Sequence, residues 1–570
     1  MKSYRVRERL HEELLPHLML ARGVGESEHD AFLTPDFERD SHDPFLLPDM
    51  GKAVERIIAA KNSGEKIAVW SDYDCDGIPG GVLLIDFFRS IGVTAAHYIP
   101  DRHAEGYGLN NDGLAELAAQ GVTLVITVDL GTTDVEPITF ANSKGIDVIV
   151  TDHHLVLPAE GASRSPSGED ASAGLLLPPA YAVINPKRPD SHYPFDGLCG
   201  AGVAWKLAQA IQQKGKFLND GQEKWLVDLA ALGTLSDMVP LVGENRMLAR
   251  FGLLVMRSPQ ISRRRPGLAA LFTLLRIKPE LLTEDDIGFM VAPRINAASR
   301  MGTPRTAARL LGAQDKDTAL ELARELQALN DERKGLVAST VKEVNKRLAM
   351  GSVESPVIVM GSTHWRPGIL GLVANSVAEA HGKPVFLWGR EGGELVRGSV
   401  RGAAGINVVE LMATAKDIFE DYGGHTASGG FSVSETRVHE LPARLSAAYE
   451  AVASRELIKE EVLVDRELAL GEVPRAHREL KKLAPFGVGN SKPLFMFPRV
   501  AVSGARMFGK QQNHLEVMLG RGNERVAGIS FFFNPESFTK KTLEGETADI
   551  VGHVETDWRG QPRVRIVDIL

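Results

Sequence analysis

Short apolar runs alternate with helix-periodic stretches over residues 46–190 of the 570-residue chain. The runs are rich in Val and Ile and have the length of strands. They are Lys66–Trp70, Ala95–Ile99, Leu124–Val128 and Asp147–Val150. The stretches between them have helical periodicity, as in Val82–Ser90, Asn111–Ala119 and Val135–Ser143. This alternation predicts a parallel sheet built from right-handed crossovers, with ligands bound beyond the carboxyl ends of its strands.

The pattern changes twice further along the chain. Residues 198 to about 350 look mostly helical, and Asp317–Met350 predicts one long helix bridging two domains, with no Pro and a single Gly, Gly335. A second α/β pattern begins at Pro356–Met360 and includes a helix after Pro367, two further strands and the glycine-rich segment Gly423–Gly430. From about residue 456, short strands with turn residues predict a small β-barrel.

These patterns predict an α/β chain of five segments. They are an N-terminal arm (1–45), a parallel-sheet domain (46–325), a connecting helix (326–350), a second α/β domain (351–455) and a barrel (456–570). Residues 158–180 are rich in Ser, Gly, Ala and Pro without periodicity, which predicts a surface insertion.

Composition narrows the class of protein. Lys and Arg total 65 and Asp and Glu total 74, a net charge of −9, so a whole-chain basic footprint for nucleic acid is absent, although local basic patches remain compatible with it. Two cysteines argue against a disulfide framework or a structural zinc site. The charged N-terminus lacks the apolar core of a signal peptide, and no apolar run reaches membrane-helix length. We therefore expect a cytoplasmic protein without membrane contact.

Acidic and imidazole side chains follow several of the predicted strands. They lie in Asp72-Tyr73-Asp74-Cys75-Asp76-Gly77, in Val128-Asp129, in Thr151-Asp152-His153-His154 and in Gly233-Thr234-Leu235-Ser236-Asp237. Carboxylates this numerous cannot share one pocket unpaired, because like charges raise each other's pKa values or recruit cations. Neutral imidazole beside them favours a transition metal such as Mn²⁺ over an all-oxygen Mg²⁺ or Ca²⁺ site. The pattern predicts a metal-dependent hydrolase with two metals.

Single motifs have other interpretations. The Asp-x-Asp-x-Asp-Gly run also occurs in calcium loops and in Asx-rich turns. The calcium interpretation is disfavoured because the twelfth loop position, where a Glu ligand is required, is Leu83. Asp237 taken alone is compatible with a helix C-cap, whereas two adjacent histidines after an apolar strand rarely serve packing.

Taken together, the motifs resemble the DHH phosphoesterase superfamily, and within it the bacterial RecJ single-strand exonucleases, over nearly the whole chain. Beyond the four acidic segments, the resemblance rests on residues 100–109 (Pro-Asp-Arg-His-Ala-Glu-Gly-Tyr-Gly-Leu), 294–301 (Arg-Ile-Asn-Ala-Ala-Ser-Arg-Met), 365–371 (Trp-Arg-Pro-Gly-Ile-Leu-Gly), 398–401 (Gly-Ser-Val-Arg), 423–425 (Gly-Gly-His) and 485–490 (Pro-Phe-Gly-Val-Gly-Asn). It implies a DHH domain, a DHH-associated domain joined by a long helix, and an oligonucleotide-binding (OB) barrel.

The resemblance implies roles for the acidic residues. Asp74 and Asp76 resemble ligands of one ion each, and Asp129 the carboxylate that bridges the two. His153 and Asp237 resemble further ligands of the second ion. His154 resembles a contact to the scissile phosphate, and Asp152 the residue that orients a neighbouring histidine. Asp72 lies nearby, and the resemblance gives it no defined role. The implied cofactor is two ions of Mn²⁺ or Mg²⁺, and both metals stay open.

The resemblance also implies the substrate contacts. Arg102 and Tyr107 would hold the DNA terminus, and Ser399 and Arg401 a 5′ phosphate, since a guanidinium can grip phosphate oxygens bidentately. Further candidates near the metals are Arg300, His425 and Arg294, which otherwise suit surface arginines and a satisfied histidine. In the barrel, suitable cations and rings for a single strand are Arg506, Phe508, Lys510, His514, Arg521 and Arg525.

The sequence departs from the family pattern at four places. Cys75 stands where the family has a small Ala, and Pro79-Gly80-Gly81 replaces the usual hydroxyl and small residues that open the following helix. Ser299 replaces a Gly, and Gly402 replaces a Ser after Arg401, which bears on the strength of end recognition. None of the four removes an implied metal ligand.

The chain is therefore expected to be a 5′→3′ exonuclease that degrades single-stranded DNA to mononucleotides in recombination and repair. The resemblance implies a 5′-phosphorylated single strand as substrate, with a single-strand-binding protein and a helicase as partners. Two alternatives stay open: a DHH phosphodiesterase acting on short oligonucleotides, and a non-catalytic repair or replication scaffold. The barrel and the length argue against the first, and the full set of acidic ligands argues against the second.

Overall fold

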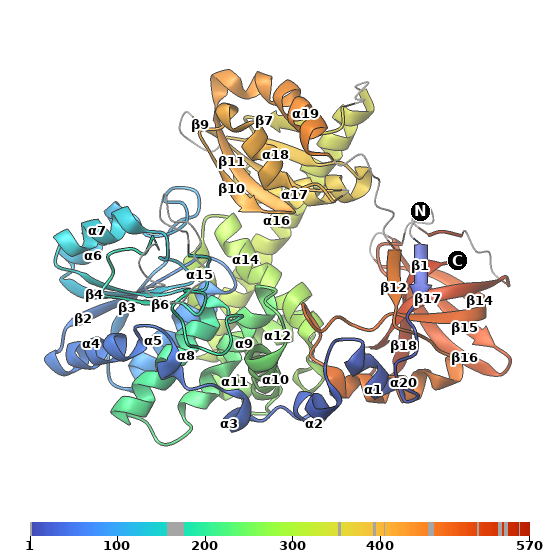
Figure 1. Ribbon diagram of the computed structural model, residues 1–570, viewed down its shortest axis with the longest axis horizontal. Helices are drawn as coiled ribbons and strands as arrows, with labels where there is room; N and C mark the ends of the chain where they lie inside the picture. The colour runs from blue at the N-terminus through green and yellow to red at the C-terminus, as the bar shows by residue number, and fades with distance from the viewer. Residues whose placement is uncertain are drawn as a thin grey trace.

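The computed structural model forms two α/β lobes and a barrel (Figure 1). The described residues are 3–156, 176–350, 355–390, 395–403, 405–453, 461–509, 512–533, 538–540, 545–557 and 559–570. Most of the predicted insertion at 158–180, and the barrel candidate Lys510, lie outside them. We call the part from α4 to α15 the first lobe, the part from β7 to α19 the second lobe, and the part from β13 to β18 the barrel domain.

The first lobe contains a fully parallel sheet in the strand order β3-β2-β4-β5-β6. Its strands are β2 (Lys66–Ser71), β3 (Ala95–Tyr98), β4 (Val122–Val128), β5 (Asp147–Thr151) and β6 (Ala182–Ile184). One face packs against α4 (Met50–Ser63), α5 (Gly77–Ser90) and α8 (Gly200–Gly215), the other against α6 (Asn111–Ala119) and α7 (Val135–Ser143). Because both faces are covered, the strands are continuous apolar runs. The predicted parallel sheet is confirmed, with β6 added after the insertion.

Helix α5 lies unusually close to the sheet and to α8. A Cβ on Gly80 would lie 2.7 Å from Val128 Cγ1, and one on Gly81 would lie 2.5 Å from His97 Nε2. Pro79 occupies the first turn, where a missing N–H costs nothing. The departure of residues 79–81 from the family pattern therefore gives a helix that can approach its neighbours closely.

The rest of the first lobe is helical, as predicted. Its helices include α9 (Val227–Ser236), α10 (Gly243–Met256), α11 (Ile261–Arg264), α12 (Pro266–Leu275), α13 (Glu284–Asp286), α14 (Ala292–Arg300) and α15 (Pro304–Leu311). The predicted long helix is α16 (Lys316–Met350), unbroken at Gly335. It packs on α12, α14 and α15 and then on α17 (Pro367–His381), and so joins the two lobes (Figure 1).

The second lobe contains a mixed sheet in the order β10-β11-β9-β8-β7, in which only β7 and β8 are parallel. Its strands are β7 (Ile358–Ser362), β8 (Val385–Gly389), β9 (Leu395–Arg401), β10 (Asp421–His425) and β11 (Ser428–Ser434). Helix α17 covers one face, and α18 (Val408–Thr414) and α19 (Leu441–Val452) cover the other. The predicted glycine-rich segment forms the β10–β11 hairpin.

The barrel domain closes on itself because β14 pairs with both β15 and β17. Its elements are β13 (Arg466–Glu467), α20 (Val473–Leu483), β14 (Phe495–Phe508), β15 (His514–Arg521), β16 (Glu524–Ser530), β17 (Thr547–Thr556) and β18 (Pro562–Ile569). Closure leaves the five barrel strands without a free edge. The predicted barrel is confirmed.

The N-terminal arm packs against the barrel domain. Strand β1 (Ser3–Val6) pairs in parallel with β12 (Glu461–Val464), and α1 (Leu14–Leu20) packs with α20. Helices α2 (His29–Leu33) and α3 (Phe37–Asp40) lead from there to the first lobe (Figure 1). Within the described residues, no helix is both long and apolar enough to cross a membrane.

Candidate active site

The turn after β2 carries three aspartates into the first lobe's carboxyl edge. Asp74 Oδ1 accepts hydrogen bonds from the backbone N–H groups of Asp76 (2.8 Å) and Gly77 (3.1 Å), which starts α5. Asp76 accepts from Gly200 N–H (2.6 Å) and Ala201 N–H (2.9 Å) at the N-terminus of α8. This helix end favours the negative charge of Asp76. Burial and the charge of Asp74 still raise the pKa of Asp76 to about 6.

Asp129 follows β4 in a strained backbone conformation. Its φ is +65°, a left-handed value that is uncommon for a residue with a side chain. Its N–H donates to Thr151 O (3.0 Å), and Tyr107 Oη donates to its carbonyl oxygen (3.0 Å). A Cβ on Gly200 would lie 2.4 Å from Asp129 Cβ, so glycine is required there. Neighbouring backbone therefore holds Asp129 in place.

Asp152 organises the two histidines after β5. Its Oδ1 accepts from His153 N–H (2.7 Å) and lies 2.7 Å from His154 Nδ1, while its Oδ2 accepts from Thr132 N–H (3.0 Å). Burial opposes ionisation of Asp152, but the hydrogen bond and charge of His154, with the hydrogen bond of Thr132, together outweigh burial and lower the pKa of Asp152. Burial likewise opposes protonation of His154, yet Asp152 raises the pKa of His154 to about 9. His154 is thus a cation at neutral pH.

His153 lies among three carboxylates. Its Nε2 is 3.1 Å from Asp129 Oδ1, 3.7 Å from Asp237 Oδ2 and 3.8 Å from Asp76 Oδ2. The prediction that Asp237 follows a strand is wrong, because Asp237 reaches this place from the C-cap of helix α9, the alternative that its own motif left open. Burial, and then the charge of His154, lower the pKa of His153 to about 3, so its imidazole is neutral and offers a lone pair.

The carboxylates and His153 form groups that suit divalent cations. Among the residues that the structure describes, three groups have ligand atoms within 4.8 Å of one another: Asp72–Asp74–Asp129, Asp76–His153–Asp237 and Asp129–His153–His154. Burial and neighbouring carboxylates raise the pKa of Asp237 to about 8 and those of Asp72 and Asp129 well above their usual range. The buried Oδ1 atoms of Asp72 and Asp129 accept no hydrogen bond. Bound cations would offset the repulsion between the carboxylates and would give the unpaired oxygen atoms a partner, so the residues fit metal binding.

Arginines border the acidic groups. The Arg102 guanidinium lies 5.1 Å from the ring centre of Tyr73, and Arg300, at the end of α14, donates to Gly368 O (2.8 Å) of the second lobe. Burial, and then the charges of Arg102, Arg333 and Arg401, lower the pKa of Arg300 to about 9. Burial and these like charges disfavour the charged form of Arg300, and an anion beside Arg300 would offset both effects. Arg294 instead donates hydrogen bonds to Gln327 Oε1 (2.8 Å) on α16 and to Met290 O (2.5 Å) of the first lobe.

The second-lobe candidates share one face of its sheet. Arg401 on β9 is in register with Ser428 on β11, which is in register with His425 on β10. Ser399 lies two residues from Arg401 on the same strand, so its side chain points to the same side. A Cβ on Gly371 of α17 would lie 2.9 Å from Arg401 Nη2. These residues therefore line up on the α17 side of the sheet, rather than among the carboxylates.

Two further residues, Asn296 and His103, support the site although neither was assigned a role from the sequence. Asn296 Oδ1 accepts from Cys75 N–H (2.9 Å), which fixes the turn between Asp74 and Asp76. His103 Nε2 lies 3.2 Å from Arg300 O, at the contact between the lobes. Asn296 lies in the family motif 294–301 and His103 in the motif 100–109, but neither residue type at these positions has a chemical feature that predicts its contact.

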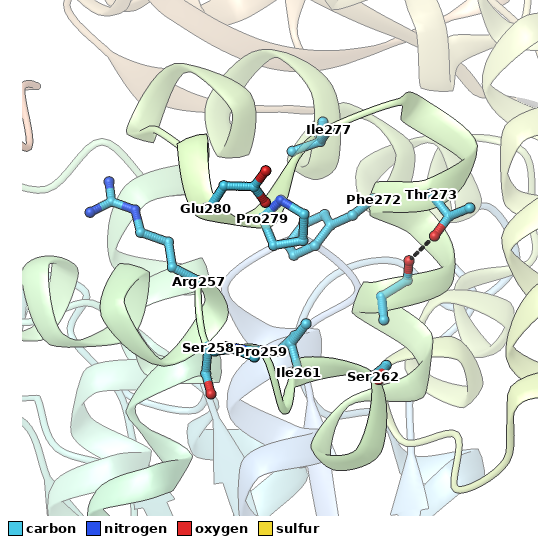
Figure 2. Close-up of a pocket in the computed structure, with 11 residues that line it drawn as sticks. Arg257, Ser258, Pro259, Ile261, Ser262, Phe272, Thr273, Ile277, Pro279 and Glu280 are labelled. Atoms are coloured by element: carbon cyan, nitrogen blue, oxygen red, sulfur yellow. Dashed lines mark hydrogen bonds between the residues drawn. The ribbon is translucent and has the colours of Figure 1, made fainter. Parts of the chain in front are cut away.

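A separate pocket lies elsewhere in the first lobe. It has a volume of about 350 Å³ and is lined by helices α11 and α12 and the segments before and after them, with Arg257, Phe272 and Glu280 around it (Figure 2). Arg257 is occupied by hydrogen bonds to Leu282 O (2.8 and 2.6 Å). The pocket shares no residue with the acidic groups. The candidate active site is the acidic groups, because they contain the residues that can bind metal.

Three protein families match parts of the chain. They are the DHH family N-terminal domain at residues 66–234, the DHHA1 domain at 354–454 and the RecJ OB domain at 464–567. The matches cover the first lobe's sheet, the second lobe and the barrel domain, which establishes the predicted combination of domain types. The predicted boundaries between the segments stay predictions.

Curated relatives and solved structures agree with these families. The single-stranded-DNA-specific exonuclease RecJ of Bacillus subtilis is 30% identical over 98% of this chain and 68% of its own length. RecJ of Salmonella typhimurium is 31% identical over 84% of this chain and 82% of its own length. The structure of RecJ from Thermus thermophilus in complex with Mn²⁺ is similar over 100% of this chain and 79% of its own, with TM-score 0.77 and 28% identity. The same protein was also solved with Mg²⁺ (TM-score 0.72, 27% identity).

Proposed function

The chain belongs to the RecJ family of single-stranded-DNA-specific exonucleases, and we propose that it removes mononucleotides from the 5′ end of single-stranded DNA with two divalent cations. It is thus a metal-dependent hydrolase of DNA. The proposed reaction is supported most by the buried cluster of carboxylates and the cluster of arginines adjacent to it. A phosphodiester with bound cations satisfies both clusters at once.

We assign the ligands by the groups they form. Asp74 and Asp129 would serve one ion, with Asp72 beside them, and Asp76, His153 and Asp237 the other, with Asp129 between the two. Bound cations would lower the pKa of a water and neutralise charge on the attacking and leaving oxygens. Mn²⁺ suits the mixed oxygen and imidazole ligands, and Mg²⁺ remains compatible with the carboxylates.

The other side chains orient the phosphate. His154, held by Asp152, is a cationic donor at the carboxyl edge, with Tyr107 Oη 3.4 Å from its Nδ1. Arg102 and Arg300 would balance phosphate charge next to the metals, while Ser399, Arg401 and His425 would hold the 5′ terminal phosphate. The loss of a hydroxyl at Gly402 leaves Arg401 and Ser399 as the main contacts of that phosphate.

The test is digestion of a 5′-labelled and a 3′-labelled single strand, and of duplex, with Mn²⁺ and with a chelator. Metal-dependent release of mononucleotides from the 5′ end of the single strand alone would support the proposal. Release from the 3′ end would contradict the polarity. Cleavage of very short oligonucleotides alone would indicate the smaller DHH phosphodiesterases, and DNA binding without cleavage would indicate a scaffold.

The number of ions has its own test. Calorimetric titration of Mn²⁺ into the metal-free protein should give two sites, and one site in total would contradict the two-ion assignment. Cooperation with a single-strand-binding protein and a helicase is a further proposal that rests on the family resemblance. Stimulation of digestion by either protein on a structured strand would support it.

A further inference from the structure

A six-residue loop, Pro485–Asn490, leads from α20 to the barrel strands. Gly487 N–H donates to Asn490 O (3.0 Å), and Asn490 N–H donates to Gly487 O (3.2 Å). The buried Asn490 side chain donates to Leu483 O and Pro485 O, each at 2.9 Å. These bonds make a closed turn, with Val488 between its two ends.

This turn packs on the segment that follows Asp237 in the first lobe. Leu241 N–H donates to Val488 O (2.7 Å), and the Leu241 side chain is buried. A Cβ on Gly487 would lie 2.7 Å from Leu241 Cδ1 and 3.1 Å from its Cγ. A Cβ on Gly489 would lie 3.3 Å from Val242 Cγ1. Both glycines are therefore needed for the close contact.

The segment Met238–Val242 is continuous with two parts of the metal centre. Met238, next to Asp237, has a left-handed φ of +61°. Asn245 Nδ2 donates to Pro240 O (3.0 Å) and to Gly197 O (2.6 Å), just before the α8 N-terminus that holds Asp76. A displacement of this segment would reach Asp237 directly.

A buried arginine strengthens the same contact. Arg246 on α10 is 2% exposed and donates to Leu483 O (2.8 Å) and Lys482 O (3.3 Å) at the end of α20, and to Phe32 O (2.9 Å) of the arm. Carbonyl groups at a helix C-terminus favour a cation there. The barrel domain is thus fixed to the helix that follows the Asp237 segment.

We propose that the Pro485–Asn490 loop is a positioning element of the metal centre, which holds Met238–Val242 and through it the Asp237 carboxylate. The barrel domain then contributes to metal affinity as well as to holding the strand. The inference rests on the proposed role of Asp237 as a ligand.

The test is Mn²⁺ affinity without DNA, measured by calorimetry on the full chain. Gly487→Val should weaken one class of Mn²⁺ site by roughly tenfold, the lower end of what the loss of a ligand's support usually costs. Adding Leu241→Ala to Gly487→Val removes as many carbons as the valine adds, and should restore the affinity. A purely structural role would lower thermal stability without this loss and rescue.

Two control variants separate the contact from general damage. Val488→Ala shortens a 43% exposed side chain and keeps the carbonyl that Leu241 uses, so Mn²⁺ affinity should be that of the parent. Gly552→Ala, whose Cβ would lie 2.6 Å from Arg565 O inside the barrel, should lower thermal stability and leave Mn²⁺ affinity unchanged. Parent affinity in Gly487→Val, or an equal loss in Gly552→Ala, would overturn the inference.

Asp237→Ala separates the proposed role of Asp237 as a metal ligand from the proposed positioning role of the loop. If it binds Mn²⁺ as the parent does, the ligand assignment itself fails. If it weakens one class of site while Gly487→Val does not, the assignment stands and the positioning role of the loop fails alone.

Discussion

The two lobes place opposite charges at different parts of a sheet. The first lobe gathers carboxylates at the carboxyl edge of a parallel sheet whose two faces are covered. The second lobe displays Ser399, Arg401 and His425 on a face of a mixed sheet. Arg300 joins them through its bond to Gly368. The difference teaches that the groups suited to metal and those suited to terminal phosphate are built separately, so each can be altered without the other.

The largest expected effect is at the acidic edge. Asp129→Ala should lower kcat by more than about 10³-fold, since Asp129 lies between both ligand groups and metal catalysis is worth several kcal/mol. Binding of a single strand, which we propose uses the cationic face of the second lobe and the barrel, should be largely retained. Single-turnover digestion and fluorescence anisotropy measure the two quantities. Retained turnover would refute the two-metal assignment.

Metal should stabilise the first lobe because it neutralises the buried carboxylates there. Mn²⁺ at 100 times its Kd should raise the free energy of unfolding by about 2.7 kcal/mol, and a chelator should remove this gain. Thermal scans with and without Mn²⁺ measure it. Asp129→Ala should lose much of the shift while Arg401→Ala keeps it. Equal shifts in both variants would end the proposed division between the lobes.

The cationic face should matter most for the strand terminus. Arg401→Ala should weaken use of 5′-phosphorylated ends by about tenfold, the value of one charge-assisted hydrogen bond. It should also flatten the log–log salt dependence of binding by roughly 0.7 for single strands. Steady-state kinetics on 5′-phosphate and 5′-hydroxyl strands give the comparison. Arg397→Ala, exposed on the same strand, is the matched control. Equal loss on both ends would argue against a phosphate pocket.

The smallest effect concerns a titratable group beneath the acidic edge. Burial, and then Arg305, lower the pKa of His97 from 6.5 to about 4. His97 therefore binds a proton more readily in the unfolded chain than in the folded one. The contribution of neutral His97 to stability is fully present above pH 6.5 and is lost as the pH falls toward 4. The free energy of unfolding, measured in urea, should fall by about 1 kcal/mol between pH 7 and pH 5.5 because of this group.

The control for that prediction is His97→Gln, which keeps a partner for the Ser71 hydroxyl that lies 2.9 Å from His97 Nε2. This variant should show a flatter dependence on pH over the same range. An unchanged dependence would assign the sensitivity to the carboxylates instead.

Much of the fold could be predicted because buried parallel strands are short continuous apolar runs. The strands at Lys66, Ala95 and Asp147 begin where predicted. Helix α5 begins at Gly77, earlier than its periodic part at Val82, because Gly80 and Gly81 serve close packing at the expense of helix propensity. Tertiary contacts of this kind are invisible in a one-dimensional pattern.

The candidate site divides in the same way. The acidic residues other than Asp237 come together because carboxyl ends of parallel strands share one edge, which the order of the elements already implies, whereas Asp237 comes from the end of helix α9. The contact of Asn296 with Cys75 could not be predicted, since it joins α14 to the β2–α5 turn across 221 positions. Nor could the register of Arg401 with His425, because it depends on the antiparallel pairing of β9, β11 and β10.

The pairing of the N-terminal arm with the barrel domain has a consequence for synthesis. His17 Nε2 lies 2.7 Å from Asp465 O, 448 positions later, and β1 pairs with β12. On the ribosome, β1 and α1 must therefore remain without their barrel-domain partners until nearly the whole chain has emerged, while the first lobe already has its own core. Docking of these two elements on the barrel domain therefore belongs to a late stage of folding.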